Sequence, residues 1–139
     1  MPQNITTGYK ALVEAAEKEI ETVPPEEAIK LAGKPEVVLV DIRDIRELHR
    51  DGKVPGAIHA PRGMLEFWID PASPYAKPQF QQDKTFVFFC AAGWRSALAA
   101  HLAQRMGLAP VAHIEGGFSA WKKAGAPCEP PRHPAAPRF

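Results

Sequence analysis

A chain of 139 residues with 45% hydrophobic residues is long enough to form one domain with an apolar core. Its formal net charge of +1 gives no reason to expect a nucleic acid or a membrane surface as a partner. The two cysteines, Cys90 and Cys128, are too few for a disulfide scaffold or a zinc site, and no apolar run reaches the length of a membrane span.

The first third of the chain alternates between helical and strand patterns. Residues 7–21 carry apolar side chains on one face, which predicts an amphipathic helix on the outside of a sheet. Residues 21–23 are expected to form a short edge strand. A second helix should start within residues 24–27, with proline in its first turn, and run to about Ala32. The apolar run Val37–Val40 predicts a buried strand that ends at Asp41.

The segment after this strand carries several charged residues. Asp41 is interpreted either as a helix N-cap or as a catalytic residue, because ligands collect at the carboxyl ends of parallel strands. Arg43 and Glu47 are spaced so that they could pair along a short helix. Residues 57–60 read as a brief strand, and His59 is expected to be a hydrogen-bonded histidine rather than a metal ligand.

A helix is expected over residues 64–69, with Phe67 and Trp68 in the core. Arg62, just before it, is either a surface arginine or a cation at the rim of a site for an anionic substrate. Residues 70–83 hold three prolines and little periodicity, which predicts a long loop of the kind that often covers or borders a site.

The most informative stretch begins at Thr85. Residues 85–89 are β-branched and aromatic without interruption, which predicts a central parallel strand buried on both faces, with Cys90 at its carboxyl end. The small residues 91–93 allow a tight bend. From about Arg95 the apolar spacing becomes helical and continues to Gly107, which supplies the stop.

A cysteine in this position has a defined chemistry. The unpaired backbone N–H groups and the dipole at a helix N-terminus favour thiolate over thiol and form a nest for an anion. Cys90 could instead be a buried packing cysteine, which is common for free cysteines. Its position at the strand end, the bend of small residues and the nearby Arg95 favour a nucleophile.

The last part of the chain repeats the strand–helix order. Residues 111–114 are expected to form a strand. Two glycines then form a tight turn that leads into a helix over residues 118–124, in which Trp121 is a packing anchor. Beyond Pro127 the chain is rich in proline and expected to be irregular, with Cys128 as a bystander. Alternating strands and helices predict an α/β fold of three layers with a mostly parallel sheet.

The sequence resembles the rhodanese (sulfurtransferase) family over roughly residues 20–127. The motifs that carry the resemblance, in chain order, are Asp41-Ile-Arg43 with Glu47, Val54-Pro55-Gly56-Ala57-Ile58-His59, Cys90-Ala-Ala-Gly-Trp-Arg-Ser96 and Gly116-Gly117-Phe118-Ser119-Ala120-Trp121. Lys53 stands where the family usually has a histidine. The resemblance implies a five-stranded sheet in the order 1-5-4-2-3, with residues 1–19 as a helical extension, 20–127 as the rhodanese domain and 128–139 as a tail.

The resemblance also implies a reaction. In the family, the cysteine that Cys90 matches takes a sulfane sulfur from thiosulfate or a persulfide donor and passes it to cyanide, a thiol or a protein acceptor, without a metal or a cofactor. The residues that would bind the small anionic donor are Ala91, Ala92, Gly93, Trp94, Arg95 and Ser96. Supporting roles fall to Asp41 and Arg43, as a buried ion pair beside the site, and to Arg62. The N-terminus lacks the basic-then-apolar order of a signal peptide, so a cytoplasmic enzyme with a reduced thiol is expected.

Two other functions remain as alternatives. Cysteine-dependent phosphatases and arsenate reductases also use a cysteine in an anion-binding loop, but cell-cycle phosphatases of the related fold place one more residue between cysteine and arginine than the four found between Cys90 and Arg95. A non-enzymatic module for sulfur relay or binding is the other alternative, against which the presence of Cys90 speaks.

Overall fold

The structure is a computed structural model, and it describes residues 2–131. A single five-stranded sheet forms its centre, with every strand pair parallel, in the order β1-β5-β4-β2-β3. The strands are β1 (Glu21–Val23), β2 (Val37–Asp41), β3 (Ile58–His59), β4 (Thr85–Phe89) and β5 (Val111–Ile114). The predicted fold class and strand order are confirmed.

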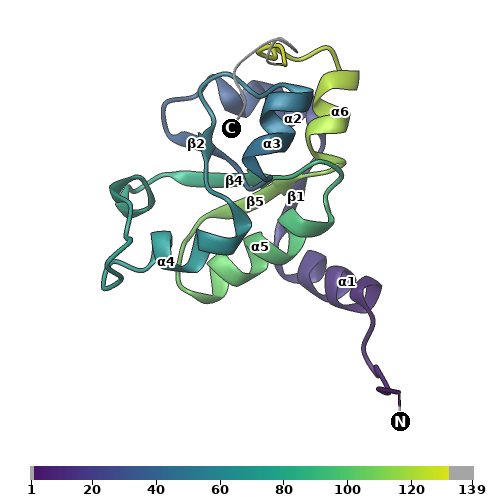
Figure 1. Cartoon of the computed structure of the whole chain (residues 1–139). Helices are drawn as coiled ribbons and strands as arrows, with labels where there is room; N and C mark the ends of the chain where they lie inside the picture. The colour runs from purple at the N-terminus through teal and green to yellow at the C-terminus, as the bar shows by residue number, and fades with distance from the viewer. Residues whose placement is uncertain (1, 132–139) are drawn as a thin grey trace.

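Helices cover both faces of this sheet (Figure 1). On one face lie α1 (Tyr9–Glu19), α4 (Leu65–Ile69) and α5 (Trp94–Arg105), and on the other lie α2 (Pro25–Ala32), α3 (Ile45–Asp51) and α6 (Gly117–Lys123). A separate cluster of buried apolar side chains lies between the sheet and each helical layer. The result is the expected arrangement of three layers with two cores.

The central strand β4 contributes to both cores. Phe86 and Phe88 point into the cluster beneath α5, whereas Val87 and Phe89 point into the cluster beneath α6, and all four are fully buried. This alternation explains why the strand is apolar at every position. Burying each large apolar side chain stabilises the fold by about 1.5 to 3 kcal/mol. The position of Cys90, which directly follows β4, is therefore fixed by a well-packed strand.

The segment around α4 differs from the expectation. A 3₁₀ turn over Arg62–Met64 precedes the helix, and a second one over Pro78–Gln81 lies inside the expected loop of residues 70–83. Phe67 is 51% exposed, so its prediction as a core residue is wrong. The short helix buries Leu65 and Ile69, and a residue midway between them must face away from the core.

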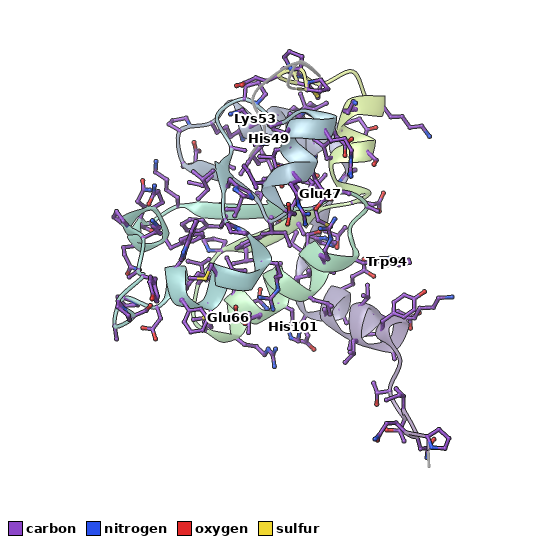
Figure 2. All side chains as sticks on the ribbon, viewed as in Figure 1. Glu47, His49, Lys53, Glu66, Trp94 and His101 are labelled. Carbon is purple, nitrogen blue, oxygen red and sulfur yellow. The ribbon has the colours of Figure 1, made fainter. Side chains whose placement is uncertain are left out.

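The chain beyond Pro127 is less irregular than predicted. Lys53 and Glu129 exchange two backbone hydrogen bonds, of 3.1 and 2.7 Å, in an antiparallel bridge. Their side chains also form an exposed ion pair, with 3.6 Å between Nζ and Oε1. Figure 2 shows Lys53 on the side of the molecule where α2, α3 and α6 lie. Residues 132–139 of the expected tail lie outside the described part of the chain.

Candidate active site

Cys90 directly follows β4 and lies at the carboxyl edge of the sheet. The residue is only 1% exposed, and its Sγ accepts hydrogen bonds from the backbone N–H groups of Gly93 (3.1 Å) and Ser96 (3.4 Å). The Ser96 hydroxyl lies 3.6 Å from the same sulfur. Donors that converge on one sulfur atom stabilise negative charge on it.

The bend that brings these donors to the sulfur depends on Gly93. Its φ of +112° lies in the left-handed region, where a side chain would be strained. The chain then enters α5 at Trp94, so the N–H of Ser96 belongs to the first turn of the helix and has no partner within it. The sulfur therefore takes the place of an intrahelical acceptor.

A second loop holds the first in place. At the start of α6, the N–H of Phe118 donates to the carbonyl oxygen of Cys90 (2.7 Å), and that of Ser119 donates to the carbonyl oxygen of Ala91 (3.1 Å). Gly117 makes this approach possible, because a Cβ at that position would collide with the Cys90 carbonyl oxygen. Sequence reasoning treated the glycine pair only as a turn and missed that it builds a wall of the site.

Arg95 does not point its charge at the sulfur. Its guanidinium forms two hydrogen bonds with the Glu47 carboxylate, of 2.9 and 3.0 Å, across a sequence separation of 48 residues. This contact raises the pKa of Arg95 and lowers the pKa of Glu47. The predicted pairing of Glu47 with Arg43 along a helix is wrong, because α3 begins only at Ile45 and Glu47 faces α5 (Figure 2).

Asp41 and Arg43 instead pair with each other in the interior. The Oδ2 of Asp41 lies 2.7 Å from the Nη2 of Arg43, and both side chains are at most 2% exposed. The same Nη2 donates to the carbonyl oxygen of Gly52 (2.9 Å), and the guanidinium lies over the ring of Phe118, 4.2 Å from its centre. The N-cap interpretation of Asp41 is wrong, because Asp44 caps α3. The pair joins β2 to the start of α6, beside the cysteine loop.

Two other charged residues of the sequence analysis have local partners. The Nη1 of Arg62 lies 2.9 Å from the Oε1 of Glu66 on α4, so its expected role at the rim of the site stays a prediction. The Nε2 of His59 lies 2.6 Å from the carbonyl oxygen of Arg43, which confirms it as a hydrogen-bonded histidine. Cys128 is exposed, whereas Cys90 is buried, and both are free thiols.

The outer side of the loop is apolar. Ala92 is exposed, and Trp94 is 58% exposed. The Trp94 ring packs against the ring of Tyr9 on α1, with 4.9 Å between the ring centres, and Figure 2 shows it on the surface beside that helix. The helix that precedes the first strand thus borders the loop.

Sequence reasoning also missed a polar group behind the loop. The Ser96 hydroxyl lies 3.0 Å from the Nδ1 of His113, a buried residue of β5. No spacing or motif marks this contact, since His113 occurs in an otherwise apolar strand and meets Ser96 only through the order of the sheet. Burial lowers the pKa of His113 to about 4.

Over residues 2–131, no three His, Cys, Asp or Glu side chains are arranged to hold a metal ion. In the same part of the chain, none of the helices combines the length and the apolar character needed to cross a membrane.

Solved structures with this fold include both enzymes and proteins of unknown activity. A polysulfide-sulfur transferase homodimer from Wolinella succinogenes is 30% identical, with a TM-score of 0.69, and the match covers 94% of this chain and 93% of that one. A protein from Rhodopseudomonas palustris, described as of unknown function and a possible tyrosine phosphatase, is 63% identical with a TM-score of 0.90, and the match covers 93% and 99% of the two chains.

Curated relatives agree with the first of these descriptions. A sulfurtransferase from Allochromatium vinosum is 29% identical over 102 residues, which cover 73% of this chain and 87% of the relative. The family model of the rhodanese-like domain matches residues 24–124, a span that runs from the end of β1 to the end of α6 and includes the cysteine loop and the glycine pair that holds it. With a match over more than half of its length, the chain belongs to the rhodanese-like domain family.

Proposed function

We propose that this protein is a thiosulfate sulfurtransferase in which Cys90 carries the transferred sulfur. The observation that supports this most directly is the convergence of the Gly93 and Ser96 backbone N–H groups on the Cys90 Sγ. Preorganised donors of this kind stabilise charge that develops on a reacting atom. A persulfide formed at Cys90 would place its anionic terminal sulfur at the mouth of the same loop.

The reaction proceeds in two displacements. The Cys90 thiolate attacks the outer sulfur of thiosulfate, a new S–S bond forms, and sulfite leaves with the electron pair of the old S–S bond. A nucleophilic acceptor such as cyanide or a thiol then attacks the terminal sulfur of the persulfide and takes it away, which returns the thiolate. Neither step calls for a metal or an organic cofactor.

Other residues of the loop support this chemistry indirectly. In this structure, Arg95 is engaged by Glu47, so we assign it to holding the loop against α3. The ion pair of Asp41 and Arg43 holds the segment between β2 and α3 in place, and Arg43 also donates a hydrogen bond to the carbonyl oxygen of Gly52. Ala91 and Ala92 line the loop with small side chains, which leaves room for a donor above the sulfur. Arg62 is proposed as a cation that attracts the donor once it leaves Glu66.

The donor and the cellular setting are part of the proposal. The relative from Wolinella succinogenes is named a polysulfide-sulfur transferase, and a polysulfide offers the same kind of sulfane sulfur as thiosulfate. The acceptor could be a small thiol or a thiol of a partner protein. Because this chemistry requires Cys90 to stay reduced between turnovers, we propose a cytoplasmic location.

A phosphatase is the second candidate, which the description of the Rhodopseudomonas palustris protein favours. A bound phosphate requires donors for three further oxygens, but only four residues separate Cys90 from Arg95. The arginine that would bind those oxygens is engaged by Glu47. Both features favour sulfur transfer over phosphate hydrolysis.

The test measures both activities on the same preparation. We expect thiosulfate:cyanide sulfurtransferase turnover and negligible hydrolysis of an aryl phosphate, with turnover abolished by Cys90→Ser. Cys128→Ser is the matched control, because that thiol is exposed and distant in sequence, and it should behave like the native protein. Mass spectrometry after thiosulfate treatment should find one added sulfur on the peptide that contains Cys90. Phosphatase turnover without any persulfide would reverse the assignment.

A further inference from the structure

A chain of hydrogen bonds leads from the candidate nucleophile to the first strand. The Cys90 sulfur lies 3.6 Å from the Ser96 hydroxyl, which lies 3.0 Å from the Nδ1 of His113. On the other side of the imidazole, Nε2 lies 3.1 Å from the hydroxyl of Thr22, the residue opposite His113 in the pairing of β1 with β5. The Glu17 carboxylate of α1 lies 3.8 Å from the same Nε2.

The ring in this chain is neutral near pH 7. Burial lowers the pKa of His113 to about 4, so the imidazole carries one N–H and has one nitrogen free to accept. When a neighbouring group donates to one ring nitrogen, the other ring nitrogen carries the hydrogen and needs a neighbouring acceptor. The partner of Nε2 consequently determines what Nδ1 offers to Ser96.

Two proton arrangements fit these contacts. In the first, Thr22 donates to Nε2, Nδ1–H donates to the Ser96 oxygen, and the Ser96 hydroxyl is left to donate either to the sulfur or to the Gly93 carbonyl oxygen at 3.3 Å. An anionic sulfur is the stronger acceptor, so the hydroxyl turns to it. In the second, Nε2–H donates to Thr22, the Ser96 hydroxyl donates to Nδ1, and Ser96 can only accept from a Cys90 thiol.

We propose that Thr22 and Glu17 are positioning residues that act through His113 to decide whether the Ser96 hydroxyl donates to the Cys90 sulfur. The first arrangement depends on the Thr22 hydroxyl, because this hydroxyl is the donor that an unprotonated Nε2 requires, whereas a protonated Nε2 can donate to the Glu17 carboxylate instead. The negative charge of Glu17 supports the second, because it attracts a proton on Nε2. The proposal rests on the proposed function only in taking Cys90 as the nucleophile.

The two residues lie outside the family match. Both residues precede residue 24, where that match begins. Glu17 lies in α1 and Thr22 lies in β1. Among the described residues, Glu17 is the acidic group that lies within 4 Å of Nε2, and its side chain is 44% exposed. At the other end of the hydrogen-bond chain, Arg95 interacts electrostatically with Cys90. Neither Thr22 nor Glu17 touches the sulfur, and they act on it only through His113 and Ser96.

The experiment measures how the ionisation of Cys90 depends on pH. In a Cys128→Ser background, the ultraviolet absorbance of the thiolate reports Cys90 whether or not the protein transfers sulfur. Thr22→Val removes the hydroxyl but keeps the shape, and we expect the midpoint of thiolate formation to rise by about one pH unit, the size of one hydrogen bond to a charged group. Glu17→Gln should lower the midpoint by a few tenths of a unit, as expected for a partly exposed charge.

Controls separate this effect from general ones. Thr22→Ser restores the hydroxyl and should return the midpoint toward that of the native protein. Glu14→Gln removes an exposed carboxylate from the same helix without a contact to His113 in the structure, and it should leave the midpoint unchanged. Thermal unfolding of each variant checks that the fold is intact. Shifts of opposite sign in Thr22→Val and Glu17→Gln support the proposal, and any other pattern in the two variants overturns it.

Because the absorbance does not depend on turnover, a protein without sulfurtransferase activity could still show the opposite shifts. In an active protein, the rate of persulfide formation from thiosulfate should follow the same midpoints. Failure of the proposed function and failure of this inference are therefore distinguishable.

Discussion

Replacing Gly117 with alanine tests whether the glycine pair holds the cysteine loop. Gly117 has a φ of +58°, and a Cβ there would collide with the carbonyl oxygen of Cys90 and lie 2.8 and 2.9 Å from the carbonyl carbon and oxygen of Ala91. These are backbone atoms, which cannot rotate away as the end of a side chain can. The start of α6 and the cysteine loop would therefore have to separate.

The cost can be worked out from the contacts that separation breaks. An alanine in the left-handed region costs about 1 to 2 kcal/mol. The hydrogen bonds from Phe118 and Ser119 to the loop contribute about 1 kcal/mol each. We therefore expect Gly117→Ala to lower the free energy of unfolding by about 3 to 4 kcal/mol. The loop that remains would be displaced, so sulfur transfer should fall sharply even where the protein is fully folded.

Urea unfolding and sulfurtransferase turnover, measured in parallel, provide the assay. The matched control is Gly125→Ala, because Gly125 also has a positive φ (+78°) but a Cβ there meets no described atom within 4 Å. The control should lose only about 1 kcal/mol and keep its activity. Equal losses of stability in the two variants, with full activity in both, would refute the argument that Gly117 is needed for close approach.

Two further predictions concern buried titratable side chains. Arg43→Met should lower the free energy of unfolding by about 3 to 5 kcal/mol, because it leaves the Asp41 carboxylate buried without its partner, and Asp41→Asn in addition should recover part of that loss in urea unfolding. The unfolded His113 titrates near 6.5 and the folded one near 4, so stability should fall as the pH drops from 6.5 to 4, by about 3 kcal/mol in total. His113→Asn should remove that part of the acid sensitivity, and unchanged acid sensitivity would contradict the neutral buried ring.

Much of the local structure follows from the sequence alone. The uninterrupted apolar run before Cys90 predicts a central strand, since only a strand covered on both faces is apolar at every position. Small residues, then a helical spacing that ends at Gly107, predict the bend and α5. These patterns are short-range, and they suffice to place the cysteine at a strand end beside a helix N-terminus. The order of the strands came from the family resemblance rather than from any pattern of this kind.

Side-chain partners that are distant in the sequence were decided by the tertiary structure. Glu47 looked like a helical partner of Arg43, but the helix begins after Arg43, and the sheet brings Glu47 to Arg95 instead. Ser96 meets His113 because β5 lies next to β4, a neighbour relation that periodicity does not encode. Local patterns record which face of an element is buried, whereas the groups that face one another across two elements depend on how those elements pack. The position of Cys90 at a strand end beside a helix N-terminus was therefore readable from the sequence, and the groups that hold and orient its loop were not.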